Sequence, residues 1–370
     1  MYCYGITQQG SYHIQNGTEC QDFHYIKKVS DDCIIVAVAD GLGSEIHSGI
    51  ASKMAATDSV EFCVSNFPEK LTDENVLQLI SDSFVCALQK IADEVEREDE
   101  DINQYDTTLC LAVYKENTVY FGQSGDSGII VLCTDGHYEG ITERQRDENG
   151  CVFPLSSGKE RWTFGQKSDV ASLLLATDGM LDIFFPVLLH SEKVKIYIAL
   201  AQFFMDGCAL GIDELGETVV KEKMEAFVQS IPATQVCDDK TVLVVVNERI
   251  KPQRQDDSYY QIPNWTELEK RRREEFNRLA YPHIYADKKN CDGEKSHSIS
   301  ETAQKSIGDV DFDCDAKQAE GSAMADDNLI SDYTSDKNEE KESDRTTCGG
   351  KFARIIDKIV AAFKHITGKE

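Results

Sequence analysis

The chain has 370 residues and is 41% hydrophobic, which is enough for one large core with additional segments or for two modest domains. Its formal net charge of −28 argues against nucleic acids and anionic membranes as partners of most of its surface. The 13 cysteines contain no Cys-x-x-Cys pair, so we expect reduced thiols rather than disulfides. No secretory signal is visible, and Pro186 and charged residues interrupt the most apolar helical stretch. These features predict a soluble, cytoplasmic protein.

Between residue 1 and about residue 247, strand-like runs of Val, Ile and Leu alternate with segments of helical periodicity. We expect strands at Cys33–Ala39, Leu109–Tyr114, Val119–Gln123, Ile129–Cys133, Ser172–Ala176 and Val242–Val246. We expect helices at about residues 44–67, 72–98, 187–204 and 213–230. The short polar connection at residues 115–118 predicts a hairpin. Strands grouped around consecutive helices favour an α+β class with antiparallel sheets over alternating β-α-β units.

The segment Glu139–Gln166 is polar and carries several glycines, which is typical of a functional flap or of a disordered loop. After residue 247 a polar linker leads to a helix expected at Asn264–Tyr281, where Asn264 and Glu267 form a capping box. We expect this helix to pack on the domain through four apolar residues, Trp265, Leu268, Phe276 and Leu279.

The end of the chain changes character twice. Residues 288–350 are rich in charge and poor in aromatics, so we expect disorder, whereas residues 351–370 place apolar side chains opposite basic ones and predict a basic amphipathic helix. We divide the chain into a domain at 1–248, a linker with its packed helix at 249–287, an acidic disordered linker at 288–350 and the helix at 351–370. This last helix would tether or regulate the domain by binding a membrane surface, a partner protein or the acidic body of the same chain.

Four aspartates lie at the ends of strands or polar turns: Asp22, Asp40, Asp178 and Asp238. Strand ends can aim side chains at one point, and several carboxylates at one point stay ionised only when cations neutralise them. Hard divalent cations such as Mg²⁺ and Mn²⁺ prefer oxygen ligands and serve phosphoryl chemistry. The Asp-Gly pairs are also common in structural turns, so from these residues alone a shared metal site and a set of turns both remain open.

Six segments occur in the order SYHIQNGTECQDF, VAVADGLGSEIHSGIAS, YDTTLCLAVY, YFGQSGDSG, LLLATDGM and CDDKTVLVVV, over nearly all of residues 1–247. In sequence and order they resemble the metal-dependent protein phosphatases of the type 2C class, specifically a bacterial branch. The resemblance implies two antiparallel β-sheets packed as a sandwich and flanked by helices, in α-β-β-α layers. It also implies a serine/threonine phosphatase that acts on phosphorylated proteins with two Mn²⁺ or Mg²⁺ ions at one end of the sandwich.

Carried over by this resemblance, Asp40 would bridge both metal ions and the carbonyl of Gly41 would bind one of them. Asp22 would act mainly through water, while Asp178 and Asp238 would hold the second ion. A water molecule between the ions would attack phosphorus without a covalent enzyme intermediate, which makes Asp40 and Asp178 the central catalytic aspartates.

Other positions follow the family less closely. Asp239 stands where the family often has asparagine, so we expect it beside the metal ligands. Asp126, in the Gly-Asp-Ser signature, is expected to be a buried structural group. Candidates for binding a third metal ion are Asp101, Asn103 and Asp106.

Two departures concern substrate and proton handling. Many relatives have an arginine that grips the phosphate just before their Glu-Asp pair, and this chain lacks it; His13 is the nearest polar substitute, unless it is a surface histidine. Leu42 replaces a histidine that some relatives use as proton donor, which leaves metal-bound water or His47 for that role, unless His47 is a surface residue.

Two other functions remain open. A pseudophosphatase that serves as a phosphoprotein-binding scaffold would explain the missing arginine, although a scaffold has no need of four converging carboxylates. Hydrolysis of a small phosphate ester is also compatible with the motifs.

Overall fold

The computed structural model describes residues 1–43, 45–70 and 72–282. They form one compact unit that extends to Arg272 and the beginning of a second unit that starts at Arg273. The remainder of the linker from residue 283, the segment 288–350 and the helix expected at 351–370 lie outside the described residues. Among the described helices, none combines the length and the apolar character needed to cross a bilayer. The cysteines that the structure describes carry free thiols, as expected.

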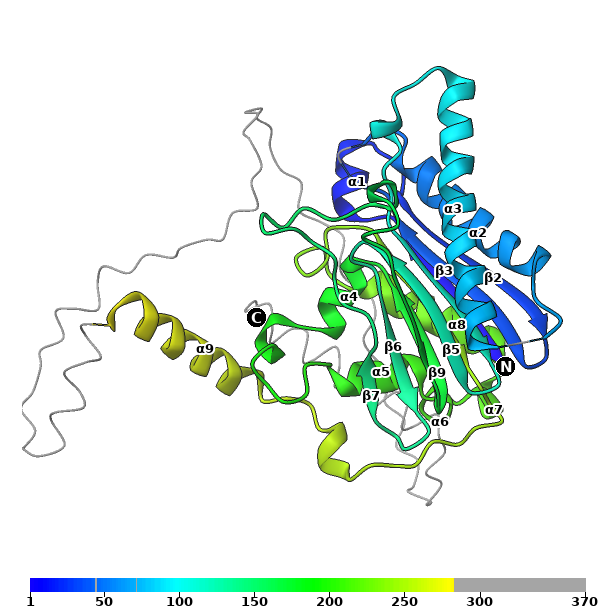
Figure 1. Ribbon diagram of the computed structural model, residues 1–370. Helices are drawn as coiled ribbons and strands as arrows, with labels where there is room; N and C mark the ends of the chain where they lie inside the picture. The colour runs from blue at the N-terminus through cyan, green and yellow to red at the C-terminus, as the bar shows by residue number, and fades with distance from the viewer. Residues whose placement is uncertain (44, 71, 283–370) are drawn as a thin grey trace, which may run out of the picture. The chain divides into compact units, whose positions relative to one another are not determined.

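Two five-stranded antiparallel sheets form the centre of the first unit (Figure 1). The first has the order β1 (Tyr2–Gln8), β10 (Lys240–Val246), β9 (Val170–Ala176), β6 (Gly128–Cys133) and β7 (Tyr138–Gly140). The second has the order β2 (Asp22–Ser30), β3 (Cys33–Asp40), β4 (Leu109–Lys115), β5 (Thr118–Ser124) and β8 (Thr163–Lys167). The predicted hairpin is confirmed, because Lys115 pairs with Thr118 where β4 turns into β5.

Three apolar layers hold the sheets and helices together. Between the sheets, Val36 and Val38 of β3 belong to the same buried cluster as Leu173 of β9 and Val245 of β10. On the outer faces, α2 (Ser48–Ser65) and α3 (Asp73–Glu98) cover the second sheet, while α4 (Asp178–Phe184), α5 (Ile198–Met205) and α8 (Glu217–Ser230) cover the first (Figure 1). The expected α+β sandwich with α-β-β-α layers is therefore confirmed.

Short elements complete the described chain. They are α1 (Ser11–Asn16), η1 (Ile102–Gln104), η2 (Leu155–Ser157), η3 (Val187–Leu189), α6 (Gly207–Leu210), α7 (Ile212–Leu215), η4 (Asp257–Tyr260) and α9 (Trp265–Ala280). Asn264 caps α9 as predicted, since its Oδ1 accepts the N–H of Glu267 at 3.2 Å. Trp265 and Leu268 are buried, but the expectation for Phe276 and Leu279 is wrong: they are 64% and 77% exposed and lie beyond Arg272, where the compact unit ends.

The long helix predicted at residues 187–204 is wrong in its first half. Only the single turn η3 forms there, and α5 begins at Ile198. Pro186 fixes the backbone before the turn, and the polar residues 190–195 interrupt the apolar periodicity that a helix needs. The helix predicted at 44–67 starts late, because α2 begins at Ser48. The helix predicted at 213–230 is divided at Gly216 into α7 (Ile212–Leu215) and α8.

Sequence analysis missed four strands. Strand β2 lies at a sheet edge and carries Lys27 and Lys28. The two lysines interrupt the apolar pattern by which a strand is predicted, and their charge protects the edge from pairing with other chains. The irregular segment expected at 139–166 ends in β8, which pairs with β5. The ring of Phe164 in β8 lies 5.4 Å from that of Phe84 in α3, so the end of this segment belongs to the core.

Candidate active site

The ends of β2 and β3 bring Asp22 and Asp40 side by side, because the two residues are direct cross-strand partners. Two threonines directly before β4 fix the backbone of Asp40. Thr108 donates its N–H to the Asp40 carbonyl at 2.8 Å and accepts the Asp40 N–H on Oγ1 at 3.0 Å. Thr107 donates its hydroxyl to the same carbonyl at 2.9 Å. Three hydrogen bonds to Thr107 and Thr108 thus set the conformation of the chain at Asp40.

Asp178 and Asp238 come from the other sheet. Asp178 is the first residue of α4, directly after β9, and Asp238 lies two residues before β10, the strand next to β9. The two sheets are linked at this end by Thr177, which donates its hydroxyl to Asp22 Oδ2 at 2.8 Å. All four predicted aspartates are therefore at the same end of the sandwich.

A pocket of about 130 Å³ opens among these side chains. It is lined by Asp40, Gly41, Leu42, Gly43, Thr108, Asp126, Val152, Asp178 and Asp238. One carboxylate oxygen from each of Asp40, Asp126 and Asp178 lies within 4.8 Å of the other two. Asp126 was expected to be structural, and it is indeed buried, but the structure adds it to this cluster. Its signal in the sequence was the Gly-Asp-Ser turn directly after β5.

The carboxyl groups of this site repel one another. Burial, followed by the charges of Asp22 and Asp178, raises the pKa of Asp40 well above its usual range. Burial and Asp239 do the same for the pKa of Asp22, and burial and Asp238 raise the pKa of Asp178. A divalent cation would reverse these shifts, because its charge favours the ionised form of every carboxyl group around it.

The donor set fits a hard divalent cation. It consists of carboxylate oxygens and, at Gly41, a backbone carbonyl, with neither a cysteine nor a histidine lining the pocket. The glycine is required by packing, since a Cβ at position 41 would lie 2.7 Å from the carbonyl oxygen of Ser48. The residues present could therefore hold Mg²⁺ or Mn²⁺.

Arg146, in the polar segment between β7 and β8, was not predicted as a site residue. Its Nε lies 2.9 Å from Asp126 Oδ2 and its Nη2 lies 3.1 Å from Asp178 Oδ2. It therefore brings a positive charge to the cluster from a segment for which sequence analysis left a functional flap and a disordered loop open. The run Arg144-Gln-Arg146 was the available signal, although its distance from Asp178 along the chain hid the pairing.

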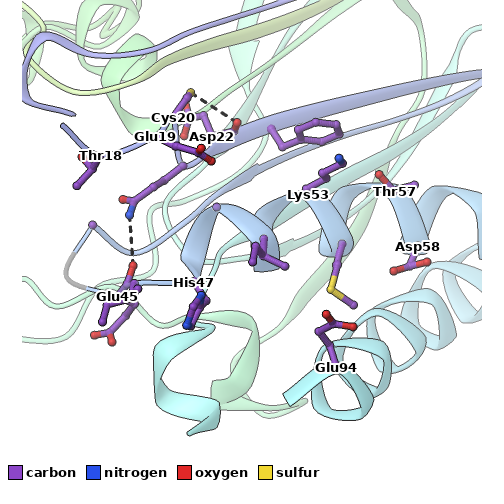
Figure 2. A pocket seen from close by; sticks show the side chains of 17 residues that line it. Thr18, Glu19, Cys20, Asp22, Glu45, His47, Lys53, Thr57, Asp58 and Glu94 are labelled. Atoms are coloured by element: carbon purple, nitrogen blue, oxygen red, sulfur yellow. Dashed lines mark hydrogen bonds between the residues drawn. The ribbon is translucent and has the colours of Figure 1, made fainter. Parts of the chain in front are cut away.

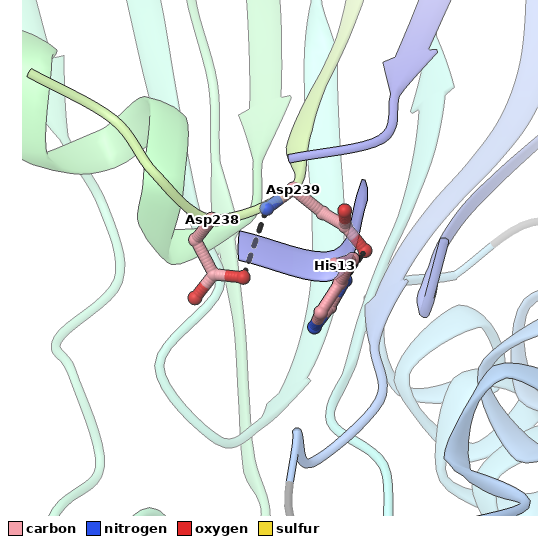
Figure 3. A group of neighbouring side chains, drawn as sticks. All are labelled: His13, Asp238 and Asp239. Atoms are coloured by element: carbon pink, nitrogen blue, oxygen red, sulfur yellow. Dashed lines mark hydrogen bonds and ion pairs between the residues drawn. The ribbon is translucent and has the colours of Figure 1, made fainter. Parts of the chain in front are cut away.

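His13 is buried beside the site rather than on the surface, with 4% of the residue exposed (Figure 3). Its Nδ1 lies 2.9 Å from Oδ2 of Asp239. Asp239 also accepts the backbone N–H groups of Gly10 and Gln21, both at 2.6 Å. Ligand atoms of His13, Asp238 and Asp239 lie within 4.8 Å of one another, so Asp239 adjoins Asp238, the residue that the resemblance implies as a metal ligand.

The structure places His47 away from the pocket of the aspartates. Its Nε2 lies 3.0 Å from Glu100 and its ring stacks on Tyr105 at 4.9 Å. The three candidates for a third metal ion also lie outside the pocket lining: Asp101 caps η1, Asn103 bonds to Asp101, and Asp106 accepts the hydroxyl of Ser156.

A family model of protein phosphatase 2C matches residues 9–228. Because the match covers more than half of the 370 residues, the chain belongs to this family. The class of enzyme that the family defines is the metal-dependent protein-serine/threonine phosphatase, as the motifs implied. Among curated proteins, the chain has no significant match.

Several solved structures are similar to the chain. The serine/threonine phosphatase PstP of Mycobacterium tuberculosis is 19% identical with a TM-score of 0.46, over 65% of this chain and 96% of that one. Stp1 of Staphylococcus aureus is 15% identical with a TM-score of 0.44, over 66% and 95%. The serine-threonine phosphatase 2C of Toxoplasma gondii is 16% identical with a TM-score of 0.46, over 66% and 94%.

Proposed function

We propose that this protein removes phosphate from phosphoserine and phosphothreonine of other proteins, using two Mn²⁺ or Mg²⁺ ions. The observation that carries the proposal is the convergence of Asp40, Asp126, Asp178 and Asp238 on one pocket of about 130 Å³. Carboxylates at this density repel one another, and their burial raises that cost. A metal site explains why the chain retains all of them.

In this proposal Asp40 and the carbonyl of Gly41 hold the ions together with Asp178 and Asp238, and Asp22 supports them through water. When bound, the two ions would supply a water molecule of lowered pKa for in-line attack on phosphorus and would neutralise the phosphoryl oxygens. The protein's own part is to fix the ligands, and the bonds from Thr107 and Thr108 to Asp40 serve that purpose.

Two more groups of the chain can serve the substrate. The guanidinium of Arg146 is a cation that lies next to the aspartates. We therefore assign it the role of binding the substrate phosphate, in place of the arginine that many relatives carry elsewhere in the chain. His13 is held by Asp239 and lies adjacent to Asp238. We assign His13 the role of orienting either the loop that carries Asp238 or the leaving group of the substrate. His47 is the weaker candidate for protonating the leaving group, because its ring is engaged by Glu100 and Tyr105.

The test is hydrolysis of phosphoserine and phosphothreonine peptides by the full chain with Mn²⁺, with Mg²⁺ and with chelator. We expect turnover that requires metal and is lost in Asp40→Asn and Asp178→Asn, but not in the control Asp31→Asn, which lies in the turn after β2. A folded protein that binds phosphopeptides without turning them over under any metal would favour the pseudophosphatase scaffold. Turnover of small phosphate esters alone would favour a small-molecule substrate.

A further inference from the structure

A groove of about 1000 Å³ runs beside the aspartate pocket, between residues 18–23 and the first half of α2 (Figure 2). Its side on α2 consists of residues at helical spacing, including Ile50, Lys53 and Met54. The loop residue Gly43 lines both the groove and the aspartate pocket, so the two cavities adjoin at this residue. A chain that lies in the groove can therefore present one of its residues to the site.

The groove is strongly acidic. Its lining contains five carboxylates, Glu19, Asp22, Glu45, Asp58 and Glu94, against a single lysine, Lys53. Figure 2 shows these carboxylates spread from Glu45 at one end of the groove to Asp58 and Glu94 at the other. Asp22 belongs to the proposed metal site and Glu94 pairs with Arg97. Glu19 and Asp58 are therefore the carboxylates on which we base the recognition of a ligand. An occupant with positive charge at several positions complements this surface.

The groove also offers apolar surface. Ile46 and Ile50 are 79% and 46% exposed, although large aliphatic side chains gain free energy when they are buried. Phe23 and Met54 line the groove next to them. Exposed apolar residues beside a rim of charge are typical of a surface that binds another chain.

Gln21 supplies an independent sign of a ligand. The residue is 8% exposed and lines the groove, and its Nε2 donates to the carbonyl of Glu45 at 3.3 Å. Its Oε1 has no hydrogen-bond partner among the residues that the structure describes. A buried acceptor without a donor costs free energy, and the N–H of a bound main chain is a suitable donor.

We propose that this groove binds the segment of the substrate protein next to the phosphorylated residue, and that it selects segments with lysine or arginine and an aliphatic residue. The inference rests on the proposed phosphatase function and adds the substrate class. Its basis is the adjacency of the groove to the site at Gly43, its acidic lining, its exposed isoleucines and the unpartnered oxygen of Gln21.

The test compares phosphoserine peptides with basic and with acidic flanks, and includes para-nitrophenyl phosphate, which is too small to fill the groove. We expect kcat/KM to be at least about tenfold higher for the basic peptides, with the advantage falling as salt rises. The double variant Glu19→Gln, Asp58→Asn should reduce the advantage by about threefold to tenfold, because each exposed charge pair contributes up to about 1 kcal/mol. Hydrolysis of para-nitrophenyl phosphate should not change.

The matched control is Asp31→Asn, Glu222→Gln, which removes one aspartate and one glutamate charge in the turn after β2 and on α8. We expect it to leave the preference unchanged. Equal kcat/KM for basic and acidic phosphopeptides would overturn the inference, while the metal-dependent hydrolysis of both peptides would still uphold the proposed function. Should nothing be hydrolysed, the proposed function fails, and anisotropy of labelled phosphopeptides still tests the groove: tighter binding of basic peptides supports it and equal affinity overturns it.

Discussion

The guanidinium of Arg146 lies 3.1 Å from the carboxylate of Asp178, although 32 positions separate the two residues in the chain. The same group contacts Asp126, so one flap residue holds two carboxylates of the site. Divalent cations at the site would take over the charge of these carboxylates, and the guanidinium would then be available to an anionic substrate.

We therefore expect Arg146→Ala to raise KM for phosphopeptides by about tenfold to a hundredfold. A charge-assisted hydrogen bond contributes about 1.5–3 kcal/mol, and each step of about 1.4 kcal/mol corresponds to a tenfold change in affinity. Arg146→Lys should raise KM less than Arg146→Ala does, because lysine keeps the positive charge but not the paired N–H donors of the guanidinium. The control is Arg144→Ala, since Arg144 pairs with Asp182 at 2.6 Å instead. Steady-state kinetics at saturating Mn²⁺ would contradict the assignment if both alanine variants behaved alike.

Asp238 and Asp239 are neighbours with different expected roles. Asp239 is buried and accepts two backbone N–H groups, whereas Asp238 is exposed and lines the aspartate pocket. Asp239→Asn can replace only one of the two accepting oxygens, so we expect it to reduce the free energy of unfolding by about 1–3 kcal/mol. Asp238→Asn should change it by less than about 0.5 kcal/mol but weaken Mn²⁺ binding. Chemical denaturation of the metal-free proteins and Mn²⁺ titration separate the two roles, and equal stability of both variants would contradict them.

The parts of this molecule that were predictable share one physical feature. β3, β9 and β10 are apolar runs buried on both faces, so their ends, and with them Asp40, Asp178 and Asp238, could be located from hydrophobicity alone. Strand β2 could not be located in this way, because an edge strand needs few apolar residues. The contact of Arg146 with Asp178 and the burial of His13 depend on how loops fold back over the sheet end, which no local pattern records.

Metal binding should make stability depend on pH in a definite direction. Folding raises the pKa of Asp22, Asp40 and Asp178, so without metal the native state holds protons that the unfolded chain releases. The resulting stability is fully present below about pH 4 and is lost as pH rises through the raised pKa values. Mn²⁺ requires the ionised forms, so we expect its stabilisation to be larger at pH 8 than at pH 5. Thermal melts with and without chelator measure this, and Asp40→Asn should show a smaller Mn²⁺ shift at both pH values.

His24 is expected to oppose this trend. Burial, with a smaller effect of Lys221, lowers its pKa from 6.5 to about 4. The unfolded chain therefore binds a proton between these values and the native state does not, so this contribution falls as pH drops from about 6.5 to 4. From pH 7 to pH 5 the loss is about 2 kcal/mol. Denaturation of wild type and His24→Asn at both pH values isolates the effect, and an equal pH dependence of the two proteins would refute it.

The basic segment at residues 351–370 has a counterpart in the acidic groove beside α2. The segment contains Lys351, Arg354, Lys358, Lys364 and Lys369 with only two acidic residues, and its apolar residues suit the exposed Ile46 and Ile50. The 68 residues at 283–350 can span up to about 220 Å, which is enough to reach any face of the domain. We therefore predict that this segment occupies the groove of its own chain.

Removal of residues 351–370 should then lower KM for basic phosphopeptides several-fold, because the local concentration of a tethered ligand is high, on the order of millimolar. It should leave para-nitrophenyl phosphate hydrolysis unchanged, and a synthetic 351–370 peptide should restore the higher KM by competition. A scrambled peptide of the same composition is the control, since it keeps the charge but not the spacing of the apolar residues. An unchanged KM after truncation, together with binding of the full chain to anionic vesicles, would instead assign the segment to a membrane surface.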